Sequence, residues 1–347
     1  MKRACFLLPP ILTLHLVLAS CSGRDTLLNE VDPDLQSELS KPVDSPPKKA
    51  PGLGYVDSIS YMSRTAHMVN GDTSGLWPVR SPLPLEGAVL PYKRIVAYYG
   101  NFFSKQMGAL GEYPKEEMFA RLKNEVAEWE KADPTTPVVP ALHYIAVTAQ
   151  PRPGSDNGYR LRMPHREIEK TIAMASEIGA LVFIDIQVGH STLQRELPEL
   201  ERFLKMPNVH LGIDPEFSMK GGERPGAAIG TYDAEDVDYA SGYLADLVRG
   251  NGLPPKILVI HRFTQDMVTG YERMRTRPEV QVVMHMDGWG APQRKLETYE
   301  THIRKKPVQF TGFKVFYKND IKHPPHRLLT PKELVALKPM PMYIQYQ

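Results

Sequence analysis

The sequence predicts an α/β fold, a (β/α)8 or TIM barrel preceded by a lipoprotein signal peptide and a tether. After Pro91, eight short apolar runs alternate with amphipathic stretches over about 255 residues, the size and repeat of this barrel. The last run lies at the C-terminus, where it would close the ring. A doubly wound open sheet is the alternative, but no glycine-rich motif with dinucleotide-binding spacing follows the first run.

The apolar runs are the predicted strands. Runs that are apolar nearly throughout, and separated by helices, are typical of a parallel sheet covered on both faces. They comprise residues 94–100, 137–147, 180–188, 209–214, 256–261, 280–288, 309–317 and 341–346.

Helices are predicted between the strands. Several of these stretches begin with Pro, Ser, Thr or Asp and stop at Gly or Pro, as helix ends do. They comprise residues 114–132, 164–180, 191–206, 233–252, 264–278, 294–306 and 330–338. Two connections, residues 147–164 and 216–233, are longer than an ordinary turn, so we expect lids or binding loops there.

Residues 1–20 predict a bacterial lipoprotein signal peptide. Lys2 and Arg3 precede a short apolar run, and the LASC motif that ends at Cys21 resembles the site where the signal is cut before a cysteine that receives lipid. We therefore expect palmitate and related lipid on Cys21, and an extracytoplasmic, membrane-anchored lipoprotein of the bacterial cell envelope. Cys5 lies inside the signal, so we expect no disulfide and no cysteine-ligated zinc.

The rest of the chain divides into three parts. Residues 21–54 are polar and proline-rich and predict a lipid-anchored flexible tether. Residues 55–91 contain Trp77 and are expected to pack on the barrel domain, which covers residues 92–347. With 42 Lys and Arg against 40 Asp and Glu, the net charge is +2, and no basic stripe predicts nucleic-acid binding.

Polar side chains gather where the predicted strands end. Asp214 and Glu216 follow the fourth strand two residues apart, so we expect both to point into one pocket at the C-terminal rim, where barrel enzymes carry their chemistry. Asp185 and Asp287 end the third and sixth strands, and these four acids are the predicted catalytic residues. A structural role is the alternative for each, such as Asp185 capping the next helix. The predicted substrate-binding residues are Tyr98, Tyr99, Asn101, Tyr144, Gln187, His261, His285, Trp289 and Lys314.

Five motifs carry a resemblance to known proteins. In order, they are AYYGNFFSKQMGALGEYPKEEM, FIDIQVGHS, LGIDPEFSM, VIHRFTQDMV and MHMDGWGAPQRKLETY. They resemble a family of uncharacterised bacterial secreted proteins and lipoproteins, and the likeness covers about Tyr92 to Tyr317. More distantly, the chain is similar to TIM-barrel glycoside hydrolases, many of which carry an acid/base carboxylate after the fourth strand, where Glu216 stands. Many also carry a second glutamate on the seventh strand, where this sequence has Lys314, so the two-glutamate mechanism does not transfer whole.

The resemblance implies a glycoside hydrolase acting on a polysaccharide or cell-envelope glycan without a cofactor. Glu216 would be the general acid, Asp214 or Asp287 the partner carboxylate, and Asp185 an orienting group. Two alternatives stay open: a metal-dependent hydrolase and a non-catalytic glycan-binding surface lipoprotein. The metal ligands would come from His143, His261, His285, Asp185, Asp214, Glu216 and Asp287.

Overall fold

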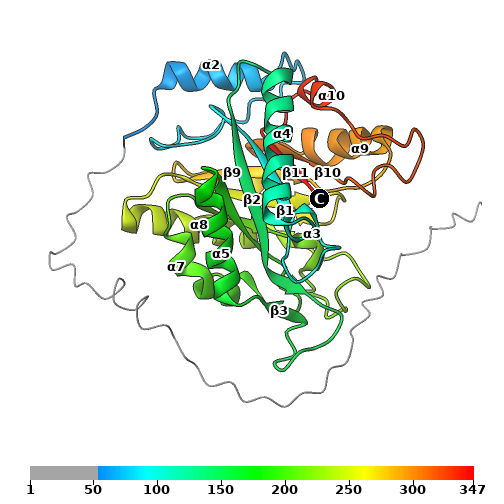
Figure 1. The fold of residues 1–347 in the computed structure, drawn as a ribbon. Helices are drawn as coiled ribbons and strands as arrows, with labels where there is room; N and C mark the ends of the chain where they lie inside the picture. Colours follow the sequence, from blue (N-terminus) through cyan, green and yellow to red (C-terminus); the bar gives the residue numbers. More distant parts are fainter. Residues whose placement is uncertain (1–53) are drawn as a thin grey trace, which may run out of the picture. The chain divides into compact units, whose positions relative to one another are not determined.

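The computed structural model describes residues 54–347, which form a closed barrel of eight parallel strands (Figure 1). The first strand pairs with both the second and the last, which closes the ring. This confirms the predicted (β/α)8 barrel and excludes the doubly wound sheet. Around the ring, the strands are β1 (Arg94–Gly100), β2 (Val138–Ala149), β4 (Leu181–Ile186), β5 (Val209–Ile213), β7 (Lys256–Arg262), β9 (Val280–Met286), β10 (Phe310–Val315) and β11 (Tyr343–Tyr346).

Helices cover the outside of this ring, with α4 (Lys115–Ala132), α5 (His165–Glu177) and α8 (Ala234–Asn251) against β2, β4 and β7 (Figure 1). Alpha-helices and short helical turns match most of the predicted helical stretches. They are α4 (Lys115–Ala132), α5 (His165–Glu177), α6 (Leu193–Glu196), η1 (Pro198–Leu200), α7 (Glu201–Leu204), α8 (Ala234–Asn251), α9 (Pro292–Tyr299), η4 (Glu300–Arg304) and α10 (Pro331–Val335). A further short helix, α3 (Ala109–Glu112), lies outside the predicted stretches.

Two helix predictions need correction. The stretch 191–206 is broken into α6, η1 and α7, because Pro198 has no N–H to continue a helical ladder. The stretch 264–278 holds only the short strand β8 (Val268–Thr269) and the turn η3 (Tyr271–Arg273). There the Arg262 guanidinium donates hydrogen bonds to three backbone carbonyls of residues 264–268, and a helix would need these carbonyls for its own hydrogen bonds. In addition, Gly270 adopts φ +64°, which is outside the helical region.

Both enlarged loops carry short strands of their own. In the loop after β2, β3 (Arg160–Arg162) turns back and pairs antiparallel with the end of β2. In the loop after β5, β6 (Tyr232–Asp233) pairs with β8 from the loop after β7. These pairings order the rim at the C-terminal end of the barrel.

Residues 55–91 pack against the opposite, N-terminal end of the barrel. The helix α2 (Ser58–Val69) and Trp77 join the same apolar cluster as the inward-facing residues at the starts of the strands, such as Ile95 and Ile257. The Gln281 side chain on β9 hydrogen-bonds the backbone of Leu90 in both directions. The interior of the barrel is therefore closed at this end by the chain itself.

The predicted signal peptide, both cysteines and residues 21–53 of the predicted tether lie outside the described residues. Between residues 54 and 347, no helix is both long enough and apolar enough to cross a bilayer.

Candidate active site

Side-chain alternation along the strands places a polar layer inside the C-terminal half of the barrel. Tyr99 on β1 and His143 on β2 point inward, and both rings approach His261, which comes from β7 on another part of the ring. Their chain neighbours, Tyr98 and Tyr144, point outward. Tyr98 hydrogen-bonds Tyr317 at 3.0 Å, and Tyr144 packs on Phe102, so these two predicted residues do not join the interior site.

Asp185 lies at the centre of this layer and is fully buried. One of its oxygens accepts a 2.8 Å hydrogen bond from the Tyr99 hydroxyl. The other oxygen faces Nε2 of His143 at 3.3 Å and Nε2 of His261 at 3.4 Å. Asp185 does not cap the next helix, which begins at Leu193. Two imidazole nitrogens and a carboxylate oxygen therefore converge, and such donors suit a transition metal ion.

Electrostatics keep this carboxylate charged. Burial alone would raise the pKa of Asp185, but the charge of His261 and the ring nitrogens of both histidines, 3.3 and 3.4 Å from its Oδ1, hold the pKa well below its ordinary value. Burial would likewise lower the pKa of His261, but the charges of Asp185 and Asp287 raise it to about 10. The polar layer therefore stabilises the ionised forms of Asp185 and His261.

Asp287 extends the chain of charges toward the rim. Its Oδ2 lies 2.7 Å from Nδ1 of His261, and its Oδ1 lies 2.8 Å from Nζ of Lys314. The same ammonium group lies over the Tyr99 ring, 4.0 Å from its centre. Burial opposes ionisation of Asp287, but the charges of Lys314 and His261 hold its pKa well below the ordinary value.

Asp214 and Glu216 do not share a strand face, because β5 ends at Ile213 and Pro215 begins the short helical turn η2 (Pro215–Phe217). The Asp214 side chain caps this turn, accepting from the backbone N–H of Glu216 at 3.1 Å, and it also accepts from Gln187 at 3.3 Å. Burial raises the pKa of Asp214 to about 7.

Glu216 has a different environment from the other acids. Its side chain is half-buried, and its carboxylate has no hydrogen-bond or ion-pair partner within residues 54–347. Burial, followed by the charges of Asp214 and Asp287, raises the pKa of Glu216 to about 8. This environment therefore favours the neutral form of the carboxyl group.

The remaining predicted residues lie in different surroundings. Asn101 bonds the backbone of Ile145 and Phe103 and thereby shapes its loop. Gln187 joins Asp214 to the backbone of Ala149. His285 is fully buried beside His261, and burial holds its pKa well below the ordinary value. Trp289 is 42% exposed in a rim loop, where it stacks on His323 and has the Arg294 guanidinium 5.9 Å from its ring centre.

Sequence reasoning missed two members of the interior layer, Tyr343 and Gln345. The Tyr343 hydroxyl lies 2.5 Å from Nδ1 of His143, and the Gln345 amide lies 3.0 Å from the same nitrogen. Both residues are on the last strand, β11, which the apolar pattern predicts only as the strand that closes the ring. Their spacing of two residues, with polar atoms at both positions, is the signal that could have identified them.

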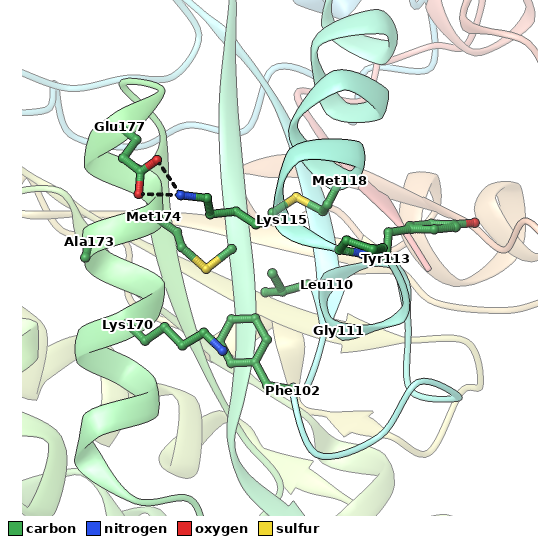
Figure 2. Close-up of a pocket in the computed structure, with 11 residues that line it drawn as sticks. Phe102, Leu110, Gly111, Tyr113, Lys115, Met118, Lys170, Ala173, Met174 and Glu177 are labelled. Atoms are coloured by element: carbon green, nitrogen blue, oxygen red, sulfur yellow. Dashed lines mark hydrogen bonds and ion pairs between the residues drawn. The ribbon is translucent and has the colours of Figure 1, made fainter.

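A separate pocket of about 460 Å³ lies outside the barrel, between the β1–α4 connection and α5 (Figure 2). Phe102, Met118 and Met174 line it, and an ion pair between Lys115 and Glu177 crosses its edge. None of the predicted site residues lines this pocket. Its apolar lining and closed ion pair offer little acid–base chemistry, so the interior carboxylates remain the better candidate site.

No protein-family model matches the chain, and no curated protein matches it. Solved structures similar to it include a GH5-4 broad-specificity endoglucanase from an uncultured bovine rumen ciliate, with 11% identity over 60% of this chain and 73% of that chain and a TM-score of 0.36. Another is a GH5 xyloglucan-specific endo-β-1,4-glucanase from a metagenomic library, in complex with cellotriose, with 11% identity over 67% and 78% of the chains and a TM-score of 0.35. Values this low carry no argument about activity, and the barrel rests on its own strand pairing.

Proposed function

We propose that the protein is a glycoside hydrolase in which Glu216 is the general acid and Asp287 is the ionised partner carboxylate. Glycoside cleavage needs one carboxylic acid to protonate the leaving oxygen, and one carboxylate that acts as a nucleophile or activates water. The observation that carries the proposal is the contrast between these two groups: Glu216 has no partner among the residues described, whereas Asp287 is held by Lys314 at 2.8 Å.

Glu216 is suited to proton donation. It is half-buried at the rim rather than sealed in the core, so a glycosidic oxygen can approach it. Partial burial and the neighbouring Asp214 and Asp287 favour its neutral form. Asp214 holds the backbone of Glu216 through the cap at 3.1 Å.

Asp287 is suited to the opposite role. The Lys314 ammonium keeps it ionised and leaves it able to face positive charge that develops on the sugar ring. Lys314 stands on the seventh barrel strand, so in this proposal that strand supports a carboxylate instead of supplying one. Asp185 acts as a positioning residue, because His261 lies between it and Asp287.

The proposed substrate is a polysaccharide or cell-envelope glycan. The exposed indole of Trp289 offers a flat apolar surface of the kind that stacks on a sugar ring. The long loops after β2 and β5 would flank the glycan.

The test is sugar release from a panel of bacterial and plant glycans by the full chain. We expect Glu216→Gln to lower kcat by about 10²–10⁴-fold. Glu223→Gln is the matched control, because Glu223 is an exposed glutamate in the same loop, and it should retain wild-type turnover. Equal activity of the Glu216 variant and the wild type would refute the proposal.

We also propose that the protein is an extracytoplasmic lipoprotein anchored through Cys21. The LASC motif after a basic and apolar N-terminus supports this assignment. Mass spectrometry of the membrane fraction should find a diacylglyceryl or acyl group on Cys21, and Cys21→Ser should move the protein out of that fraction. An unmodified Cys21 in membrane-associated protein would contradict the anchor.

A further inference from the structure

Three donor atoms in the interior layer share an unusual environment. They are Nε2 of His143, Oδ1 of Asp185 and Nε2 of His261, and all lie within 4.8 Å of one another. Each residue is fully buried, and none of the three atoms has a hydrogen bond of acceptable geometry to any residue that the structure describes. A buried polar atom without a partner costs free energy, so a missing partner needs a physical explanation.

We propose that His143, Asp185 and His261 bind a divalent transition metal ion, with zinc as the best match. The carboxylate oxygen is 3.3 Å from the His143 nitrogen and 3.4 Å from the His261 nitrogen. Charge-assisted hydrogen bonds are shorter, about 2.7–2.9 Å. Two ligands bound tetrahedrally to zinc at about 2.0–2.1 Å lie about 3.3–3.4 Å apart, which agrees with both separations.

Contacts behind the ligands orient them as metal sites require. The far nitrogen of His261, Nδ1, lies 2.7 Å from Asp287, a carboxylate that keeps a proton on Nδ1, so Nε2 is the nitrogen that binds a cation, with release of its own proton. The far nitrogen of His143 lies 2.5 Å from the Tyr343 hydroxyl. The second oxygen of Asp185 is held by Tyr99 at 2.8 Å. Each proposed ligand is therefore oriented by a polar contact to the atom that faces away from the metal position.

The backbone also makes room for this arrangement. The three ligands come from β2, β4 and β7, and β5 lies between β4 and β7 in the ring. On β5, the inward position at this level is Gly212. A Cβ atom there would lie 2.5 Å from Nε2 of His143 and closer still to Oδ1 of Asp185. Only glycine lets these donor atoms meet across the intervening strand.

The donor set selects the class of metal. Two imidazoles and one carboxylate suit zinc and neighbouring first-row ions, whereas calcium and magnesium prefer oxygen ligands alone. Glu216 and Lys314 are not in the ligand set, so the metal proposal does not depend on glycoside cleavage.

The experiment measures metal directly in the untagged full chain. Protein expressed in zinc-supplemented medium should contain about one zinc per chain by mass spectrometry of the metal. The zinc K-edge spectrum should show histidine ligation without sulfur, which separates this site from binding to Cys21. Protein expressed with cobalt should show the visible absorption of tetrahedral cobalt. These readouts need no variant.

Variants then locate the ion. His143→Ala and His261→Ala should lose the bound metal, whereas His190→Ala, which changes a histidine in a rim loop, should keep it. Tyr343→Phe keeps all three ligands and should weaken zinc binding about 10–100-fold. Folded wild-type protein with no zinc would overturn the proposal, as would unchanged zinc content in folded His143 and His261 variants.

Discussion

The two ends of the barrel interior are built from the same strands and the same inward alternation, yet they differ in kind. At the N-terminal end, Ile95, Phe183 and Ile257 pack with α2 and Trp77 in an apolar cluster. Two or four residues later on the same strands stand Tyr99, Asp185 and His261. The geometry of the strands decides which side chains meet inside the barrel. The types of those residues then decide that the N-terminal end is a packed apolar cluster and the C-terminal end is a charged site.

Two buried lysines make the comparison sharper. Lys256, at the start of β7, donates to the backbone carbonyls of Met206 and Val209, and no carboxylate lies beside it among the described residues. Burial lowers its pKa to about 7. Lys314, at the other end, holds Asp287 at 2.8 Å. The first lysine completes backbone hydrogen bonds, whereas the second organises a charge cluster.

The largest expected effect on activity, after replacement of Glu216, comes from Lys314→Met. Removing the ammonium leaves Asp287 with His261 as its remaining charged partner and weakens its ionised form, so kcat should fall by about 10²–10³-fold. Lys256→Met is the matched control at the opposite end. It should leave kcat within about twofold of wild type, because Lys256 contacts none of the site residues. Equal losses in the two variants would remove the distinction between the ends.

A substitution in the apolar cluster at the N-terminal end should lower stability rather than activity. Ile257→Ala removes fully buried methyl groups from the N-terminal cluster and should lower the free energy of unfolding by about 2–5 kcal/mol in urea titrations. Turnover of the folded fraction at low temperature should stay near that of the wild type. A large fall in kcat without a fall in stability would show that this apolar cluster directly affects the geometry of the active site.

The pH dependence provides a smaller, signed effect. Glu216 has a folded pKa of about 8 against 4.5 for a free glutamate, so turnover should fall as pH rises through about 8, when the acid loses its proton. Its contribution to stability is fully present below about pH 4.5 and is lost as pH rises toward 8, because the unfolded chain releases that proton more readily. Glu216→Gln should therefore gain about 1–3 kcal/mol relative to wild type between pH 5 and 9, after allowance for partial exposure. An equal pH response in both proteins would contradict the raised pKa.

Lys256 should change stability with pH in the opposite direction to Glu216. Its folded pKa of about 7 lies below the ordinary value of 10.5, so its contribution to stability is present above about pH 10.5 and is lost as pH falls through 7. The unfolding free energy of the wild type should rise between pH 7 and 10 relative to Lys256→Met. Urea titrations of the two proteins at both pH values measure this difference, and parallel curves would count against a buried ammonium.

The barrel could be predicted because its strands are local signals. Each apolar run is continuous in sequence, and all eight predicted strands are present. The helix expected over 264–278 was wrong, because the side chain of Arg262 takes backbone carbonyls that a local pattern assigns to a helix. A single long-range or side-chain contact can thus override a helical period.

The site could be predicted only in part. Strand ends rich in Asp and His indicated the rim, but sequence does not give the register between strands. The meeting of Asp185 with His143 and His261 depends on Gly212 lying between them, and the contact of Tyr343 with His143 depends on closure of the ring. Tyr98 and Tyr144 are each one residue away from an inward-facing position, and a shift of one residue along a strand moves a side chain to the opposite face.

The most direct test of the account compares leaving groups in Glu216→Gln. A glycoside with a dinitrophenyl leaving group departs without protonation, whereas a natural glycan needs the acid. We predict that the variant loses glycan cleavage by about 10²–10⁴-fold yet retains most of its activity on the dinitrophenyl glycoside that wild type cleaves. Equal losses on both substrates, or full retention on both, would contradict Glu216 as the general acid.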